Sequence, residues 1–308
     1  MDNKIVVALG RSAFGETFPE QKANVKLAAK AIADIAEEGY RIIITHSNGQ
    51  QLGMVHSAMT EFSRMDPRYT AAPMSLCSAM SQGYVGYDLQ NAIRTELLDR
   101  GLFFTVSTII TQVKVSTFDR AFATPTKVIG RVMDAAKAAA EERKGNYVTE
   151  VEGDFCRIVA SPKPIDIYEI DAIRALSDAG QIVIAAGGGG IPVLEQGMTL
   201  KGASAVIEKD LTAGKLAELL NADVLLFLTG NEKAARFYGT PQETALDTVS
   251  LKEAKIFVGD GSFSAHGMRP KIEASISYLT QKPDGKVLIT KMETARSALR
   301  GKTGTRIA

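Results

Sequence analysis

Residues 5–45 have the sequence IVVALGRSAFGETFPEQKANVKLAAKAIADIAEEGYRIIIT, and this stretch decides the fold class. Its two short runs rich in aliphatic residues, 5–9 and 41–45, are typical of buried strands, whereas apolar residues in the segment 22–38 recur at helical spacing. Gly39 stands directly after that segment, where a glycine commonly ends a helix. A strand, a helix and a second strand in this order predict a parallel strand pair joined by a right-handed crossover.

The same alternation continues through the rest of the chain and predicts an α/β fold. Further strands are expected at residues 103–110, 182–186, 224–228 and 286–290, with helices at 51–65, 167–179, 212–220 and 271–280. This order predicts a mostly parallel sheet covered by helices on both faces. The alternation breaks between residues 131 and 156, where an alanine- and charge-rich helix at 133–144 precedes a short acidic stretch. We interpret this segment as a small excursion from the sheet.

Composition and charge limit the classes of protein that the chain could represent. The 308 residues are 45% hydrophobic, which is ample for a buried core. Lysine and arginine number 36 against 35 acidic residues, so the net charge of +1 gives no electrostatic footprint for a nucleic acid or an anionic membrane. Cys77 and Cys156 form no CxxC pair, no apolar run reaches a membrane-spanning length, and no signal-like segment opens the chain. We therefore expect a soluble cytoplasmic protein with reduced thiols.

Three glycine-bearing loops that follow predicted strands form the first half of a predicted anion site. Ligands collect at the carboxyl ends of strands in open α/β sheets, and successive backbone N–H groups at such turns form anion-binding concavities. The loop after the second strand also precedes the helix expected at 51–65, whose N-terminus favours negative charge. Four consecutive glycines at 187–190 cost backbone entropy and indicate a close approach of a ligand to the backbone. The candidate binding residues in these loops are Gly10, Arg11, Ser12, Ser47, Asn48, Gly49, Gly188 and Gly189.

Three lysines in turn segments form the second half of this site. Lys127 and Lys271 follow prolines at positions 125 and 270, and Lys209 precedes Asp210 at the start of a predicted helix. Single lysines are usually solvated, but the carboxylate of Asp210 can hold an ammonium in place, and the helix start beside Lys271 directs charge at an anion site. Mobile ammonium groups beside backbone N–H concavities are what the transfer of a phosphoryl group requires.

Other sites suggested by short motifs fail on spacing. A P-loop at the C-terminal end needs a glycine five residues before Gly301, and Arg296 stands there. A dinucleotide fingerprint in the four-glycine run fails because its third glycine position holds Pro192. The three histidines, at positions 46, 56 and 266, have no ligand spacing and no cysteine or acidic companions, so we expect no zinc site.

With these residues assembled, the chain resembles a carbamate kinase of the amino-acid-kinase superfamily, and the resemblance runs nearly end to end. It rests on a series of segments that follow one another in the family's order. They are VVALG at 6–10, NG at 48–49, MSQG at 80–83, TQV at 111–113, PTK at 125–127, SPKPID at 161–166, GGGGIPV at 187–193, KD at 209–210, LTG at 228–230 and PKIEA at 270–274.

The resemblance implies a fold and an activity. The expected fold is a three-layer αβα sandwich with a mostly parallel sheet, divided into a lobe at 1–204 that binds the phosphoryl acceptor and a nucleotide-binding lobe at 205–308. A small protruding subdomain would occupy about 131–156. The expected activity is reversible phosphoryl transfer between carbamoyl phosphate and ADP, with Mg2+, in a cytoplasmic homodimer that serves arginine or purine catabolism.

The resemblance also assigns roles to residues of this chain. The Gly10 and Ser47–Asn48–Gly49 loops would hold carbamate and the transferred phosphoryl group, which catalytic lysines would neutralise while Asp210 orients them. The catalytic set is Lys127, Lys209, Asp210 and Lys271, and the nucleotide would lie near Thr229, Gly230, Tyr238, Met268 and Lys271. No residue of the chain is expected to be a metal ligand.

Several departures from the family pattern fall in the substrate loops. Arg11 and Ser12 stand where the family has a second glycine and an asparagine, Ser47 replaces a glycine and Gln50 a proline. Arg11 would either block the phosphate cradle or supply a further cation. Elsewhere Glu208 replaces an aspartate, and residues 265–271 differ from the usual proline- and glycine-bearing stretch. Two alternatives therefore stay open: a kinase of a different small carboxylate that forms an acyl phosphate, and a nucleotide-binding paralogue with a regulatory role.

Overall fold

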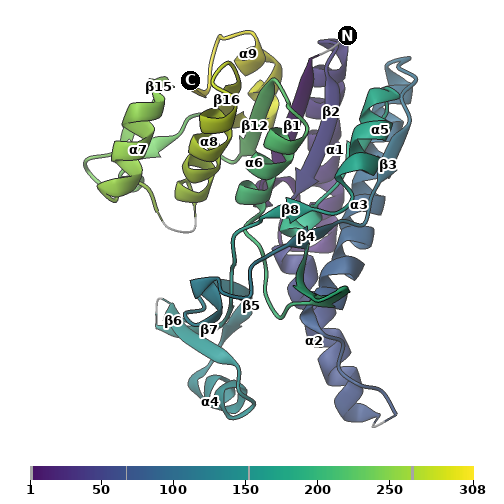
Figure 1. Cartoon of the computed structure of the whole chain (residues 1–308), viewed down its shortest axis with the longest axis vertical. Coiled ribbons are helices and arrows are strands. Elements are labelled where there is room, and N and C mark those ends of the chain that lie inside the picture. The colour runs from purple at the N-terminus through teal and green to yellow at the C-terminus, as the bar shows by residue number, and fades with distance from the viewer. Residues whose placement is uncertain (1–2, 67, 152, 265–266) are drawn as a thin grey trace.

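The computed structural model describes residues 3–66, 68–151, 153–264 and 267–308, and its centre is an eight-stranded sheet (Figure 1). Neighbouring strands are parallel at every junction except the one between β16 and β17, which confirms the mostly parallel sheet. From one edge to the other the sheet contains β15 (Thr248–Val249), β17 (Thr305–Ile307), β16 (Lys286–Lys291), β12 (Val224–Thr229), β1 (Lys4–Leu9), β2 (Arg41–His46), β9 (Ile182–Ile184) and β3 (Val106–Thr108).

Helices cover both faces of this sheet and give the three-layer αβα sandwich that the sequence predicts. Successive side chains of a strand point to opposite faces. On β1, Ile5, Val7 and Leu9 join the buried cluster on one face, and Val6 and Ala8 join the cluster on the other. The first face is covered by α1 (Phe18–Glu37), α3 (Met74–Asp99) and α9 (Ala295–Leu299), the second by α5 (Ile170–Asp178), α6 (Lys209–Leu219), α7 (Leu251–Gly259) and α8 (Arg269–Gln281).

The predicted elements exist, but several of their ends were misplaced. Helix α1 begins at Phe18 instead of residue 22, because Thr17 and Glu20 form a capping box that binds the free N–H groups of its first turn. Gly39 follows the helix with a φ of +83°, as a C-cap glycine should. The strand predicted at 103–110 is only three residues long, since β3 pairs with β9 alone at the edge of the sheet.

The segment interpreted as an excursion is a separate small sheet. It consists of β5 (Lys127–Met133), α4 (Ala135–Arg143), β6 (Tyr147–Val151) and β7 (Asp154–Val159), with strand order β5–β7–β6. The sequence predicted only a helix in this segment, not its three strands, and the unit extends beyond the 131–156 that the sequence suggested. Figure 1 shows this unit away from the main sheet, at the same end of the molecule as α2 (Gly49–Met65). We call it the small subdomain.

A second sheet lies between the small subdomain and the main body (Figure 1). It contains β11 (Thr199–Gly202), β10 (Ile191–Gln196), β4 (Gln112–Lys114) and β8 (Asp166–Ile167), and β13 (Ala235–Arg236) pairs separately with β14 (Thr244–Ala245). The main sheet takes strands from both sides of residue 204, so the division into lobes at 204 and 205 stays a prediction. In the described part of the chain, no helix combines the length and apolar character needed to cross a membrane.

Candidate active site

The loops that follow β1 and β2 are tied to the sheet by backbone hydrogen bonds at adjacent strand ends. The Gly10 N–H donates to the Leu228 carbonyl at 2.9 Å, and the Ser47 N–H donates to the Leu9 carbonyl at 3.0 Å. A Cβ at position 10 would lie 2.9 Å from the Leu228 oxygen, so only glycine fits there without a shift of the backbone. The two predicted substrate loops therefore lie side by side at the carboxyl edge of the sheet, as their positions after strands predict.

The four-glycine run forms a short 3-10 turn, η3 (Gly187–Gly189), directly after β9. Gly188 and Gly189 are buried with φ values of +67° and +92°, which other residues rarely adopt. A Cβ on Gly188 would lie 2.0 Å from the Asn48 amide nitrogen, and one on Gly189 would lie 2.5 Å from the Ile207 oxygen. The glycines thus make room for neighbouring parts of this chain, a reason different from the close ligand approach that the sequence suggested.

Asn48 joins the second loop to the helix that follows it. Its side-chain amide donates to the Ser81 hydroxyl at 2.7 Å, and it is buried at the N-cap of α2. Gly49 opens α2 and is exposed, with open space where a side chain would stand. The first N–H groups of a helix have no partner within it, so this N-terminus presents donors and positive potential at the edge of the sheet.

His46, the last residue of β2, is buried beneath these loops and packs against Phe14 with ring centroids 5.8 Å apart. Its Nδ1 lies 3.1 Å from the Ser47 carbonyl oxygen, which can only accept, so Nδ1 carries the proton and donates. Its Nε2 has no hydrogen-bond partner in the described part of the chain. Burial lowers the pKa of His46 to about 4, and the nearby Lys209 ammonium acts in the same direction. The imidazole is therefore neutral near pH 7.

The buried neutral state of His46 predicts a stability loss in acid. His46 is protonated near pH 6.5 in the unfolded chain but only near pH 4 in the folded chain. The free energy of unfolding therefore falls as pH falls from 6.5 to about 4. We expect His46 alone to remove about 3 kcal/mol from the free energy of unfolding between these limits. Urea unfolding of the protein and of His46→Gln at pH 7 and pH 4.5 measures the difference. Equal acid losses in the two proteins would contradict the assignment.

Two of the predicted catalytic lysines share one buried carboxylate. Lys209 opens α6, and its ammonium donates to Asp210 Oδ1, while Lys271 from α8 donates to Asp210 Oδ2 at 2.9 Å. Burial acts to raise the pKa of the Asp210 carboxyl, but the two ammonium groups outweigh it and hold that pKa well below its usual range. Burial lowers the pKa of Lys209 against the opposing effect of Asp210. The cluster Lys209–Asp210–Lys271 is therefore a fixed group of charges with a net charge of one positive unit when both lysines are protonated.

Lys127 reaches the same region from the small subdomain. It opens β5, and its ammonium forms an ion pair with Glu208, which is adjacent to Lys209 in the chain. The structure thus places all three predicted lysines on carboxylates at positions 208 and 210. The pairing of Lys127 with Glu208 was not anticipated, because 81 residues separate them and no local pattern links them.

Arg11 does not point into the cluster. It lies in η1 (Arg11–Ala13), is exposed, and forms an ion pair with Glu16 at 2.8 Å. Ser12 is also exposed and lies close to Gly230, since a Cβ on Gly230 would come within 3.9 Å of the Ser12 Cβ. The altered first loop therefore borders both the predicted acceptor side and the predicted nucleotide side.

The residues predicted to contact the nucleotide lie on separate segments of the C-terminal region, including the end of β12 and the start of α8. Thr229 ends β12, and its hydroxyl accepts from the Asn231 N–H at 3.1 Å. Met268 is half-buried at the N-cap of α8, one turn before Lys271, whereas Tyr238 is well exposed. Within the departing stretch 265–271, Ala265 and His266 lie outside the described residues.

Three polar residues that sequence reasoning did not assign to the site support it. Ser81 holds Asn48, the Thr212 hydroxyl donates to the Gly189 carbonyl at 2.9 Å, and Glu208 holds Lys127. Ser81 and Thr212 are buried within helices, where serine and threonine are usually exposed. No local pattern in the sequence reveals burial of this kind. In the described part of the chain, no three histidine, cysteine or acidic side chains gather as a metal site would require.

Comparison with known proteins identifies the family. The model of the "Amino acid kinase family" matches residues 3–290. The chain belongs to the amino acid kinase family. Among its curated relatives, "Carbamate kinase-like protein YqeA" of Escherichia coli K12 is 44% identical over 99% of both chains. A carbamate kinase of Pyrococcus horikoshii is 43% identical over 100% of this chain and 99% of its own.

Solved structures of this kinase family agree with the fold described above. The carbamate kinase from Giardia lamblia bound to AMP-PNP superposes with a TM-score of 0.90 at 34% identity, covering 99% of this chain and 98% of that one. This agreement confirms the predicted fold class and the resemblance drawn from the sequence.

Proposed function

We propose that this amino acid kinase is a carbamate kinase that transfers a phosphoryl group reversibly between carbamoyl phosphate and ADP. The observation that carries the proposal is the buried Asp210 carboxylate, which holds two lysine ammonium groups at the carboxyl edge of the sheet. Full-length relatives that are carbamate kinases support this substrate. The strand-end loops and the N-terminus of α2 would hold the acceptor and the phosphate.

In this reaction the chain would supply alignment and charge instead of proton transfer. The attacking oxygen of carbamate is already an anion, so no general base is needed. Lys209 and Lys271, held by Asp210, and Lys127, held by Glu208, would stabilise the charge that spreads over the phosphoryl oxygens in the transition state. The N–H groups at the start of α2, beside Asn48, would hold the phosphoryl group in line.

Binding of the nucleotide and of Mg2+ is part of the proposal, and it is inferred from the relatives of this chain. A bound AMP-PNP in the Giardia lamblia relative supports nucleotide binding, for which we propose the edge formed by Thr229, Gly230, Tyr238, Met268 and Lys271. Mg2+ usually keeps several waters and binds substrate phosphates with one or two carboxylates. The carboxylates nearest the lysines, Glu208 and Asp210, are already paired with ammonium groups, so nucleotide phosphates would supply most of the ligands for the ion. When bound, the ion would neutralise phosphate charge.

We also propose several further properties that the resemblance to carbamate kinases implies. They are a homodimer, a cytoplasmic location, a role in arginine or purine catabolism, and a division into an acceptor lobe at 1–204 and a nucleotide lobe at 205–308. They rest on the resemblance to carbamate kinases. Light scattering of the purified protein tests the dimer directly.

The test of the activity is formation of ATP from ADP and carbamoyl phosphate with Mg2+ by the purified protein. We expect ATP well above the uncatalysed background. ADP release from ATP with other small carboxylates but not with carbamate would instead identify a kinase that forms a different acyl phosphate. Nucleotide binding without turnover of any acceptor would favour a regulatory paralogue.

We expect that replacing the altered first loop by Arg11→Gly with Ser12→Asn lowers the native activity. Arg11 borders the predicted substrate loops, and its ion pair with Glu16 is exposed, so the guanidinium can move to a bound phosphate or carboxylate at little cost. Loss of one such cation should remove roughly 2–4 kcal/mol of transition-state stabilisation and so lower kcat/KM. Glu16→Gln is the matched control, because it breaks the same ion pair without removing the cation. A gain in activity for the double variant would show that Arg11 obstructs the site.

A further inference from the structure

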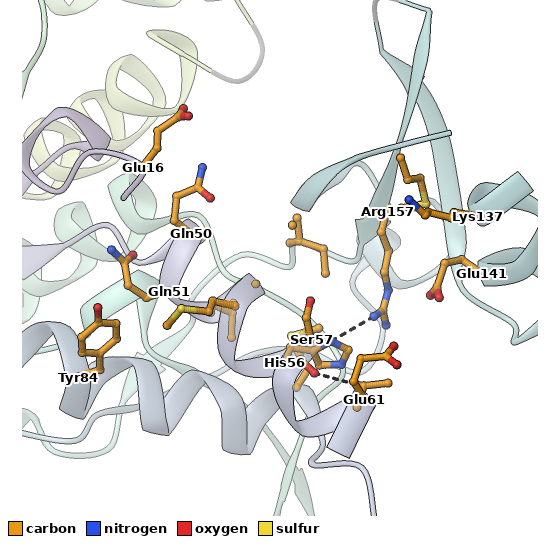
Figure 2. Close-up of a pocket in the computed structure, with 18 of the residues that line it drawn as sticks. Glu16, Gln50, Gln51, His56, Ser57, Glu61, Tyr84, Lys137, Glu141 and Arg157 are labelled. Carbon is orange, nitrogen blue, oxygen red and sulfur yellow. Dashed lines mark hydrogen bonds between the residues drawn. The ribbon is translucent and has the colours of Figure 1, made fainter. Parts of the chain in front are cut away.

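A cavity separate from the lysine cluster lies between α2 and the small subdomain. Its volume is about 780 Å3, within the range of small-molecule sites. Figure 2 shows Gln50 and Glu16 at one end and Arg157, Lys137 and Glu141 at the other, with His56 between them on α2. The walls come from α2, from β5, α4 and β7 of the small subdomain, and from residues at the start of α1 and in the first half of α3.

Most charged side chains on these walls already have partners. Arg64 is paired with Glu61, Lys144 with Glu141, and Glu16 with Arg11. Lys137, at the rim, is paired with Asp134. The charges of these side chains are therefore already matched within the described part of the chain.

Arg157 is the exception within the described part of the chain. Its buried Nε has no hydrogen-bond partner, and its guanidinium forms no ion pair. Its Nη1 donates to His56 Nδ1 over a long 3.4 Å, so the imidazole accepts there (Figure 2). Partial burial lowers the pKa of both Arg157 and His56, and the Glu141 carboxylate opposes that effect on each of them. Arg157 is only half-buried, but its Nε–H is shielded from water, and a shielded donor without an acceptor is costly.

The remainder of the cavity wall is largely apolar. Its side chains include Leu52, Met54, Met74, Ile129 and Met133. A guanidinium binds a carboxylate through two parallel hydrogen bonds, and the Nε of Arg157 is free for such a pair, since the nearby Glu141 acts on Arg157 only electrostatically and forms its ion pair with Lys144. A dianionic phosphate would carry more negative charge than the guanidinium balances. It also has no apolar part that could pack against the apolar walls.

We propose that the cavity between α2 and the small subdomain is a second ligand site, which binds a monocarboxylate with an apolar chain through Arg157. The carboxylate accepts hydrogen bonds from the free donors of the guanidinium, and the apolar chain packs against the walls that contain the methionines. The cavity bridges α2, which carries the predicted phosphate-binding N-terminus, and β5, which carries Lys127. A ligand there contacts two elements of the candidate active site without occupying the lysine cluster. This inference holds whether or not carbamate is the acceptor.

Calorimetric titration of the full chain with hexanoate, acetate and inorganic phosphate tests the site. We expect hexanoate to bind more tightly than acetate or phosphate, and Arg157→Gln to weaken hexanoate binding by about 10-fold or more. Arg306→Gln, an exposed arginine on β17, is the matched control and should bind as the unchanged protein does. Met54→Glu adds a carboxylate to the wall at an exposed position, so it should weaken binding without disturbing the fold, even if Arg157→Gln fails to fold.

Four results would overturn the proposal. Binding of hexanoate that neither Arg157→Gln nor Met54→Glu weakens would place the ligand elsewhere. No detectable binding at millimolar concentration would exclude a site for such a ligand. Phosphate or acetate binding as tightly as hexanoate would exclude an apolar-chain ligand. Loss of hexanoate binding in the presence of saturating ADP and carbamoyl phosphate would make the cavity part of the substrate site. Retained binding under those conditions supports a separate site, including in a protein that shows no carbamate kinase activity.

Discussion

Replacing Lys209 by methionine is expected to lower kcat for ATP formation by about 10^2- to 10^3-fold, the loss typical of removing one preorganised charge stabiliser. The ammonium of Lys209 is buried, and Asp210 fixes its position, so no solvent or flexible side chain can replace it. Methionine has a similar length and tolerates a buried site. Asp210 keeps Lys271 as a partner in this variant, and the fold should therefore persist.

Lys215→Met is the control for this prediction. Lys215 lies on the same helix, is partly buried and is also ion-paired, in its case with Glu218. We expect kcat within about threefold of the unchanged protein, since single exposed or partly exposed pairs contribute little. Circular dichroism of both variants checks the fold. A Lys209→Met protein that is folded and fully active would remove this lysine from the catalytic set.

The fold could be predicted from sequence because its signals are local and repeated. Residues 5–9 and 41–45 are short and mostly aliphatic, and they pair in register as β1 and β2, with Ile5 opposite Ile42. The helix between them has a period that brings one apolar face to the sheet. Its first turn was missed because the signal there is the capping box of Thr17 and Glu20, a side-chain pattern outside the apolar periodicity. Strand β6 was missed because it is largely exposed and pairs only with β7.

The candidate site was predictable only in part, because its partners are distant in sequence. Adjacency reveals that Asp210 can hold Lys209, but nothing local reveals that Lys271, 61 residues away, shares the same carboxylate. That convergence was expected through the family resemblance. The glycine run differs in this respect. The sequence indicated that position 188 requires glycine, but only the structure shows that the Asn48 side chain is the reason. The contact of Arg157 with His56 had no signal at all.

Asp210→Asn should reduce both stability and activity, because it leaves the ammonium groups of Lys209 and Lys271 together in a buried place without a counter-charge. Breaking a buried ion pair by removing one partner costs about 3–5 kcal/mol of unfolding free energy. The denaturation midpoint in urea should fall accordingly. Burial lowers the pKa of Lys209 and Asp210 opposes this effect, so loss of the carboxylate lowers that pKa further in the folded state. The unfolded variant then binds more protons than the folded variant, so the folded state is favoured as pH rises. The deficit relative to the unchanged protein should therefore shrink between pH 7 and pH 9.5.

The double variant Asp210→Asn with Lys209→Met separates the two roles of the carboxylate. Removing the buried ammonium together with its partner takes away the repulsion, so this variant should recover a large share of the stability lost in Asp210→Asn. Its activity should stay as low as that of Lys209→Met, because a neutral amide and a methionine cannot stabilise phosphoryl charge. Measured free energies of unfolding and kcat for the two single variants and the double variant complete the cycle. If Asp210→Asn were as stable as the unchanged protein, with the same pH dependence, the carboxylate would not be what holds the two lysines in place.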